Sequence, residues 1–379
     1  MQLEVCWCLT NIASGNAEQT RAVVEAGAVP VFVSMLSSGD ESLVEQSMWA
    51  IANIAGDCAE YRDGCISVGT ACALSGILDR SLQSKSTQLA RLSVWGLSNL
   101  CRGHPPPPFD SLLAAIPSLG RALSQSNDSE ILADTAWALS YLTDGADSDR
   151  MRIILSSFDI KRIVALLGHP SSSVHSPILR AVGNLVSGES AVTQLVVNSG
   201  ALNHLKSLVS SLKKSVRKEA LWTISNICAD SALMIDSVVA SGVLNQVCDM
   251  IKNGRTEADV RKEAVWILCN ISTVGSAVQV NQLVARYNMI DHLCEYLTAC
   301  RDTQSLKSCL DALYAILSIY IDDPTGYNPF RYIVEECGGL ETIEQLQQDE
   351  SAEVYNAAVR LLESFFDCQP SASLPPRDL

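Results

Sequence analysis

The stretch Met48-Trp49-Ala50-Ile51-Ala52-Asn53-Ile54-Ala55-Gly56-Asp57 predicts a helix with two unlike faces. One face is an ordinary apolar core face and carries Met48, Ile51, Ile54 and Ala55. The opposite face carries Gln46, Trp49, Asn53 and Asp57. An indole, an amide and a carboxylate make a poor core stripe, so we expect this second face to be a contact surface.

The spacing of a tryptophan and an asparagine four positions later recurs along the chain. Its copies begin at Trp7, Trp49, Trp95, Trp137, Arg180, Trp222 and Trp266, and a degraded copy begins at Asp311. The intervals are 42, 46, 42, 43, 42, 44 and 45 residues, and all 6 tryptophans of the protein occupy this position. Such a period is typical of a helical solenoid of armadillo or HEAT type.

Each interval predicts three helices, of which the first two are short (18–25 and 29–36 in one repeat) and the long third carries the tryptophan. We expect left-handed turns between them at Gly27, Gly69, Gly200, Gly242, Gly339 and Asn288. One solenoid should span residues 1–366, with about eight full repeats and a partial first repeat at 1–15. The tail 367–379 should be disordered.

Two places in the middle depart from this pattern. Pro105 to Pro108 form either a stiff connection between repeats, which we favour, or a proline-recognition ligand. Phe158-Asp159 stands where a turn glycine is expected, so the turn there must differ.

The charge composition limits which kinds of molecule the protein can bind. The net charge is −15, from 42 acidic and 27 basic residues, and the basic clusters are too short to bind nucleic acid or an anionic membrane. An acidic solenoid instead favours a cationic partner. We find no signal peptide and no apolar run of about 18 residues, which argues against secretion and membrane insertion.

The reactive side chains form no catalytic or metal-binding motif. The 14 cysteines are scattered singly, without a Cys-x-x-Cys, and Cys6 and Cys8 point to different sides of a helix. We expect them to be small buried side chains in a reducing compartment, with no metal site. No histidine stands in a catalytic or metal-binding pattern with other residues. Neither a Gly-x-Ser-x-Gly motif nor a phosphate-binding loop occurs. We therefore expect neither an enzyme nor a bound cofactor.

Stacked third helices would align their tryptophans and asparagines along an inner groove. An asparagine amide both donates and accepts, so it can hold an extended peptide backbone, whereas core packing requires no amide there. Slots between neighbouring indoles would accept the stems of lysine or arginine. Carboxylates at the groove edge would select for positive charge; the candidates are Asp57, Asp134, Asp144, Glu219 and Glu263.

At this level of detail the chain resembles the importin alpha (karyopherin alpha) family, the armadillo-repeat adaptors of nuclear import. The resemblance extends from residue 3 to about residue 366, and the segments that carry it include Asn53-Ile-Ala-Gly-Asp57, Trp95-Gly-Leu-Ser-Asn-Leu-Cys-Arg102, Leu132-Ala-Asp-Thr-Ala-Trp137 and Ser140-Tyr-Leu-Thr-Asp-Gly145. It implies an all-α, right-handed superhelical solenoid of armadillo repeats. It also implies a shuttle between cytoplasm and nucleus, whose groove binds basic mono- and bipartite nuclear localisation signals of cargo proteins.

Carried over by motif, the resemblance assigns two peptide-binding sites and a linker between them. The major site comprises Trp7, Asn11, Ser14, Gly15, Thr20, Gln46, Trp49, Asn53, Asp57, Trp95 and Asn99. The linker and minor site comprise Asp134, Trp137, Tyr141, Arg180, Asn184, Glu219, Trp222, Asn226, Glu263, Trp266 and Asn270. In the family an acidic residue follows the Asn184 helix, whereas this chain has Ser190 there, with Glu189 beside it.

The resemblance also sets expectations about partner proteins. The basic amino-terminal segment that binds importin beta in the family, together with the first repeat, is absent from this sequence, so we expect cargo binding without recruitment of that carrier. Residues 335–366 resemble the region that meets the export receptor. The alternative is an armadillo scaffold of a junctional or signalling class, but such grooves are generally basic, and an acidic groove argues against it.

Overall fold

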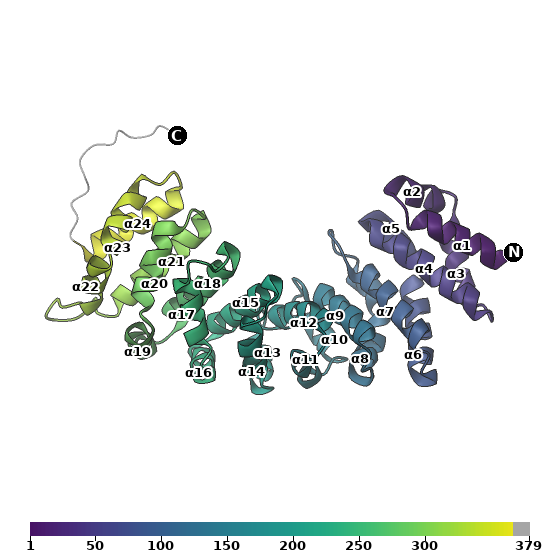
Figure 1. Cartoon of the computed structure of the whole chain (residues 1–379), viewed down its shortest axis with the longest axis horizontal. Coiled ribbons are helices and arrows are strands. Elements are labelled where there is room, and N and C mark those ends of the chain that lie inside the picture. The colour runs from purple at the N-terminus through teal and green to yellow at the C-terminus, as the bar shows by residue number, and fades with distance from the viewer. Residues whose placement is uncertain (367–379) are drawn as a thin grey trace. The chain divides into compact units, whose positions relative to one another are not determined.

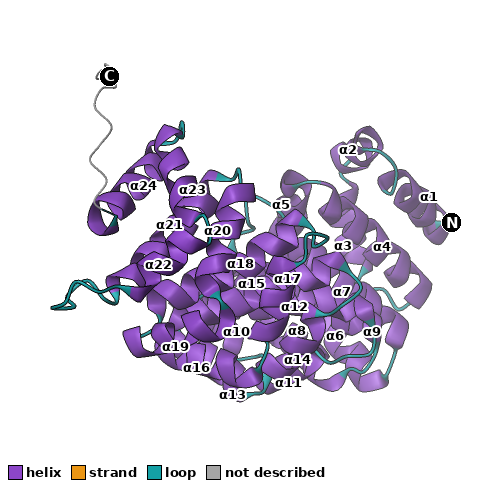
Figure 2. Cartoon of the chain, turned by 60° about the vertical axis from the view of Figure 1, so that its left-hand side comes forward, coloured by secondary structure: helices purple, strands orange, loops and turns teal. Residues whose placement is uncertain are grey.

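The computed structural model describes residues 1–366, and every regular element in that range is a helix (Figure 2). The predicted all-α class is therefore confirmed. The helices up to the middle of the chain are α1 (Gln2–Ala13), α2 (Ala17–Glu25), α3 (Ala28–Met35), α4 (Glu41–Asp57), α5 (Ala59–Ser67), α6 (Thr70–Ser84), α7 (Thr87–Cys101), the 3-10 helix η1 (Phe109–Leu112), α8 (Ala115–Gln125), α9 (Ser129–Thr143), α10 (Ser148–Leu155), α11 (Ile160–Leu166) and α12 (Ser172–Leu185).

The remaining helices continue the pattern of three helices per repeat. They are α13 (Ser190–Asn198), α14 (Ala201–Val209), α15 (Lys214–Asp230), α16 (Ala232–Ser241), α17 (Leu244–Lys252), α18 (Ala258–Val274), α19 (Ala277–Tyr287), α20 (Met289–Ala299), α21 (Thr303–Ser318), α22 (Pro329–Glu336), α23 (Gly339–Gln345), the 3-10 helix η2 (Leu346–Gln348) and α24 (Ala352–Phe365). Over residues 1–366, eight three-helix repeats follow α1, as the period predicts. The predicted tail, 367–379, lies outside the described residues.

The chain divides into two compact units, Met1–His204 and the part from Leu205 onward. In the first unit the long helices α1, α4, α7, α9 and α12 pack on one another in that order (Figure 1). In the second unit α15, α18, α21 and α24 do the same. Within each unit the helices that carry the repeated motif are therefore neighbours. The single continuous superhelix stays a prediction.

The apolar face of each long helix forms the core. Ile51 and Ile54 of α4, Leu97 of α7 and Leu139 of α9 are fully buried, as the motif predicts. Burial of an aliphatic side chain of this size contributes roughly 1.5–3 kcal/mol, so these faces supply most of the stability of each repeat.

The predicted turns are confirmed at five positions and wrong at one. The φ angles are 77° at Gly27, 83° at Gly69, 91° at Gly200, 73° at Gly242 and 48° at Asn288. The last left-handed residue is Gly338, with φ of 74°, rather than Gly339. Gly339 is instead the first residue of α23, where a side chain would overlap with Sγ of Cys294.

The two departures in the middle have local explanations. Residues 102–108 contain no helix, because four consecutive prolines supply no backbone donors, and only the short η1 follows them. At the second place Asp159 caps α11, since its carboxylate accepts a hydrogen bond from the backbone N–H of Lys161 at 3.0 Å. The turn there needs no left-handed glycine.

The expectation that the cysteines are buried is wrong for Cys8, Cys58 and Cys72, which are exposed. Cysteines that are scattered singly in the sequence also come together in space at two places. Cys269 of α18 and Cys309 of α21 place their sulfur atoms 3.9 Å apart. Sγ of Cys294 in α20 lies against Gly339, two residues after Cys337, so these two thiols are also close together. Among residues 1–366 no three potential ligands gather in a way that suits a metal ion.

Membrane-spanning potential is confined to one bent pair of helices. No single helix in residues 1–366 is both long enough and apolar enough to span a membrane. Helices α16 and α17 meet these two criteria only when they are taken together, and an 80° bend separates them.

Candidate functional site

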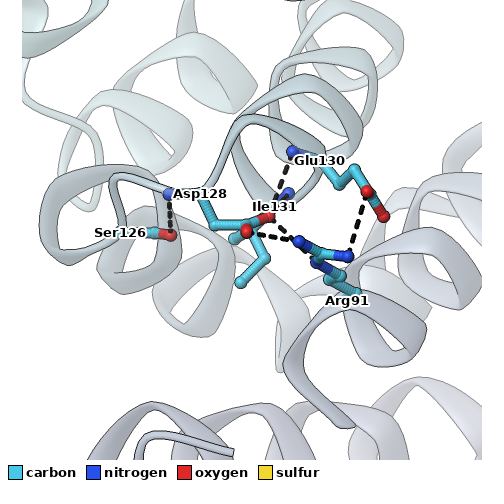
Figure 3. Close-up of polar contacts among 5 residues, drawn as sticks. All are labelled: Arg91, Ser126, Asp128, Glu130 and Ile131. Carbon is cyan, nitrogen blue, oxygen red and sulfur yellow. Dashed lines mark hydrogen bonds and ion pairs between the residues drawn. The ribbon is translucent and has the colours of Figure 1, made fainter. Parts of the chain in front are cut away.

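An ion pair joins Arg91 of the long helix α7 to the start of the next long helix, α9 (Figure 3). The guanidinium of Arg91, one turn before Trp95 in α7, donates to the carboxylate of Asp128 at 2.7 and 3.2 Å and contacts Glu130 at 3.0 Å. Asp128 is the N-cap of α9 and also accepts from the backbone N–H groups of Glu130 and Ile131. Arg91 lowers the pKa of Asp128, so the pair stays charged in mildly acidic solution.

Similar ion pairs, between a basic residue of one long helix and the N-cap of the next, occur in the second unit. Arg217 of α15 pairs with Glu257, the N-cap of α18, at 2.6 Å. Lys262 of α18 pairs with Asp302, the N-cap of α21, at 2.9 Å. The Ser305 hydroxyl and Lys262 lower the pKa of Asp302 to about 2. Sequence reasoning missed these pairs, although a basic residue four or five positions before Trp95, Trp222 and Trp266 was a readable signal.

Most of the predicted major-site residues surround one pocket of about 290 Å³ in the first unit. Seven of the eleven line it: Ser14, Gly15, Thr20, Asn53, Asp57, Trp95 and Asn99. The lining is completed by Ala13, Ala52, Gly56 and Arg102. Trp7, Asn11, Gln46 and Trp49 are not part of its lining. Thr20 is 1% exposed, and its hydroxyl already donates to the carbonyl of Ala13.

Asp57 is the carboxylate of this pocket. It is the last residue of α4, is exposed, and forms no ion pair within residues 1–366. A carboxylate at a helix carboxyl terminus faces the negative end of the helix dipole, which disfavours it by a few tenths of a kcal/mol. Asp57 therefore contributes nothing to helix stability and is available to pair with an external cation.

The asparagines of the motif are not equivalent. The side-chain amide of Asn99 donates to the carbonyl of Ala52 at 2.9 Å, that of Asn184 to Ser140 at 2.9 Å, and that of Asn270 to Ser225 at 2.8 Å. The expectation that packing requires no amide at this position is therefore wrong for these three, which join neighbouring long helices. Asn11 and Asn53 form no such side-chain bond within the described chain.

The indoles differ from the expected row of open slots. The rings of Trp49 and Trp95 meet edge to face with centroids 4.9 Å apart. A methylene chain between two ring faces needs about 7–8 Å, twice a carbon–carbon contact distance, so this slot is closed. Trp7 is 56% exposed and Trp49 40% exposed, so both offer a face to a ligand. Trp137 stacks on Tyr141 at 5.8 Å.

Two predicted groove carboxyls ionise less readily in the free protein than ordinary carboxyls do. Burial raises the pKa of Asp134 to about 6, and nearby Glu130 adds to the rise. Burial also raises the pKa of Glu263, which Lys218 and Lys262 partly oppose. A cation that binds beside either carboxyl would restore its ionised form.

Next to the first pocket lies a basic cavity of about 500 Å³. It is lined by Arg102, Arg150, Arg180, Tyr141 and Asp144, together with residues of the proline loop. Buried Arg62 donates to the carbonyl of Arg102 at 2.8 Å and holds the end of α7 in place. The two predicted linker residues Tyr141 and Arg180 are thus brought together.

The remaining minor-site residues lie on two packed helices of the second unit. Glu219, Trp222 and Asn226 lie on α15, and Glu263, Trp266 and Asn270 on α18. All six are half-buried, so each keeps part of its side chain at the surface. Asn184 belongs to the first unit. Glu189 and Ser190, at the start of α13, are exposed.

Comparisons with known proteins agree with the repeats. Residues 16–56 and 190–229 match the armadillo/beta-catenin-like repeat, and residues 328–377 match the atypical Arm repeat. The chain is 38% identical to importin subunit alpha-1b of Oryza sativa subsp. japonica, over 100% of this chain and 70% of that protein. It is 39% identical to importin subunit alpha-3 of Arabidopsis thaliana (97% and 68%) and 38% identical to probable importin subunit alpha-A of Dictyostelium discoideum (96% and 68%).

Solved structures of engineered proteins share the fold. One superimposes with a TM-score of 0.75 at 23% identity and covers 96% of this chain and 94% of its own. A computationally designed armadillo repeat protein for modular peptide recognition superimposes with a TM-score of 0.58 at 24% identity, over 66% of this chain and 99% of its own.

Proposed function

The chain belongs to the importin alpha family, and on that premise we propose that it is a nuclear import adaptor that binds the basic localisation signals of cargo proteins along its long helices. The predicted family is confirmed, and its members are transport adaptors rather than enzymes. Both mono- and bipartite signals belong to the proposed ligand class.

The observation that carries the proposal is the pocket around Asp57. A lysine of an extended peptide would place its ammonium beside this carboxylate, and Asn53 would bond the peptide backbone. Each backbone bond would contribute roughly 0.5–1.5 kcal/mol. Each lysine or arginine stem on an exposed indole, such as that of Trp7, would contribute roughly 0.5–2 kcal/mol. A few such contacts reach about −8 kcal/mol, or micromolar affinity.

The second unit would provide a weaker site of the same chemistry. Glu219 and Glu263 would attract a basic cluster to the indoles of Trp222 and Trp266. With Asn270 already bonded to Ser225, that amide has one remaining hydrogen and its oxygen to offer a peptide. Ser190 supplies no charge where the family has one, which reduces the attraction.

Partners and location follow from the same proposal. An import adaptor works in both cytoplasm and nucleus, so we expect this chain to shuttle between them. We further propose that the carboxy-terminal repeat around α22–α24 meets an export receptor. Importin beta would be recruited only through a basic amino-terminal segment of the family's kind.

The decisive experiment is a fluorescence-anisotropy titration with a labelled lysine-rich signal peptide. We expect micromolar or tighter binding that is lost when the central lysine is replaced by alanine, and that weakens when salt is raised from about 0.05 M to 0.5 M, because the ion contacts are screened. The control is the same peptide with its sequence scrambled. Equal affinity for native and alanine peptides, or no binding by a folded sample, would refute the adaptor.

Binding should also depend on pH through Asp134. Its raised pKa means that the folded protein holds a proton between about pH 4 and 6, so in the free protein folding stability falls as pH rises through that window. Peptide binding has the opposite sign, because the cation prefers the ionised carboxylate. We expect affinity to increase from pH 5 to pH 7.5 by about threefold to tenfold, measured by calorimetry.

The matched variant for this measurement is Asp134→Asn, which keeps the shape of the side chain but cannot ionise. Its affinity should change much less over the same pH range. If wild type and variant show the same pH profile, Asp134 does not contact the bound cation.

A further inference from the structure

Two cysteines that are 43 residues apart in sequence come close together in the second unit, because Sγ of Cys294 lies against Gly339, two residues after Cys337. Cys294 lies on α20, is 2% exposed, and faces the turn between α22 and α23. Cys337 is the C-cap of α22 and is half-buried. The three helices α20, α22 and α23 pack on one another (Figure 1). One thiol is therefore sheltered and its partner is reachable from solvent.

Glycine at position 339 allows this meeting. Any side chain there would overlap with Sγ of Cys294, so only glycine leaves room for the sulfur atom next to Cys337. The close approach is thus built into the turn.

The surroundings favour a thiolate on Cys337. The neighbouring Cys294 thiol and the backbone N–H of Gly339 lower the pKa of Cys337, against burial, the nearby carboxylate of Asp291 and the hydrogen bond that the Cys337 thiol donates to the carbonyl of Val334 at 3.5 Å. The pKa of Cys294 is raised, so this thiol keeps its proton. A reactive, partly exposed thiolate beside a protonated thiol is the arrangement of a peroxide-sensitive pair.

We propose that Cys337 is a site of oxidation by hydrogen peroxide and that Cys294 resolves it, closing a reversible disulfide between α20 and the end of α22. This inference does not depend on peptide binding. It concerns the carboxy-terminal repeats and uses none of the predicted signal-binding residues.

The chemistry balances in two steps. The Cys337 thiolate attacks one peroxide oxygen, the O–O bond breaks, and the departing hydroxide takes up a proton to give water; the sulfur loses two electrons and becomes a sulfenic acid. The Cys294 sulfur then attacks the Cys337 sulfur, an S–S bond forms, and the S–O bond breaks. The hydroxide that leaves takes the Cys294 proton and forms a second water. A thiol reductant reverses the bond by exchange.

The chain contains a matched control pair. Cys269 and Cys309 have their sulfur atoms 3.9 Å apart, but they are 4% and 0% exposed, and the hydrogen bond of the Cys309 thiol to Cys269 and burial raise the pKa of Cys309. These two thiols are close together, but solvent cannot reach them and nothing favours a thiolate. We therefore expect peroxide to leave this pair reduced.

The test is peroxide treatment of the full chain at low protein concentration, followed by intact mass and non-reducing peptide mapping of the monomer. We expect the loss of two hydrogen atoms and a cross-link between the peptides of Cys294 and Cys337, removed by a thiol reductant. Alkylation at pH 7 should modify Cys337 at least about tenfold faster than Cys309.

Variants separate the roles. Cys337→Ser should abolish the cross-link, and Cys294→Ser should leave a sulfenic acid on Cys337 that a dimedone probe captures. Cys294→Ala repeats the measurement with a side chain that cannot form hydrogen bonds. Cys269→Ser should leave the Cys294–Cys337 cross-link unchanged. No cross-link in the wild type, or a cross-link formed preferentially between Cys269 and Cys309, would overturn the proposal.

Discussion

Asp57→Lys is expected to weaken binding of a single-cluster signal peptide at least about tenfold, or roughly 1.4 kcal/mol, without loss of fold. The carboxylate lines the pocket with Asn53, Trp95 and Asn99, and within the described chain it neutralises no cation. A lysine there would repel the peptide lysine that Asp57 is proposed to bind. The substitution would not destabilise helix α4, because a cation at a helix carboxyl terminus is favourable. Calorimetry gives the affinity and circular dichroism the fold.

The matched control is Glu60→Lys, which changes the net charge equally. Glu60 is exposed at the start of α5, three residues from Asp57, and does not line the pocket. It should weaken binding less than about threefold, through long-range charge alone. If both variants weaken binding equally, general electrostatic attraction rather than the pocket explains the affinity.

We expect the same motif position to stabilise the fold at Asn99 and to bind peptide at Asn53. The variants Asn99→Ala and Asn53→Ala should distinguish these two roles. Asn99 is 8% exposed and bonds α7 to the carbonyl of Ala52 in α4, so its loss should ease the local opening of these helices by about 1–2 kcal/mol. Asn53 is half-buried and forms no side-chain bond within residues 1–366. Its loss should weaken peptide binding about threefold to tenfold and leave stability within about 0.5 kcal/mol.

Amide hydrogen exchange of α4 and α7 distinguishes these effects, because local opening sets the exchange rate. Faster exchange should appear in Asn99→Ala and not in Asn53→Ala. Unchanged exchange in both variants would show that the bond from Asn99 to Ala52 contributes no net stability. Unchanged peptide affinity in Asn53→Ala would remove this residue from the proposed site.

The periodic features of the protein were readable from the sequence. The interval between tryptophans determines the repeat, the apolar face of each long helix determines its core side, and glycines such as Gly27 and Gly69 determine the turns. The family was also readable, because the same residues recur in register over most of the chain. These features depend on residues within one helix or one turn, where the spacing along the chain already gives the spacing in space.

Only the tertiary structure decided what each repeated residue does. Asn53 and Asn99 occupy the same motif position, yet Asn99 bonds a helix 47 residues away and Asn53 does not. Trp49 and Trp95 close the slot between them, and Cys294 meets Cys337 across a turn that glycine keeps open. Contacts between repeats depend on the offset and rotation of neighbouring helices, to within an ångström or two. Helical periodicity specifies the face of each helix but not this placement, which packing and ion pairs such as Arg91–Asp128 determine.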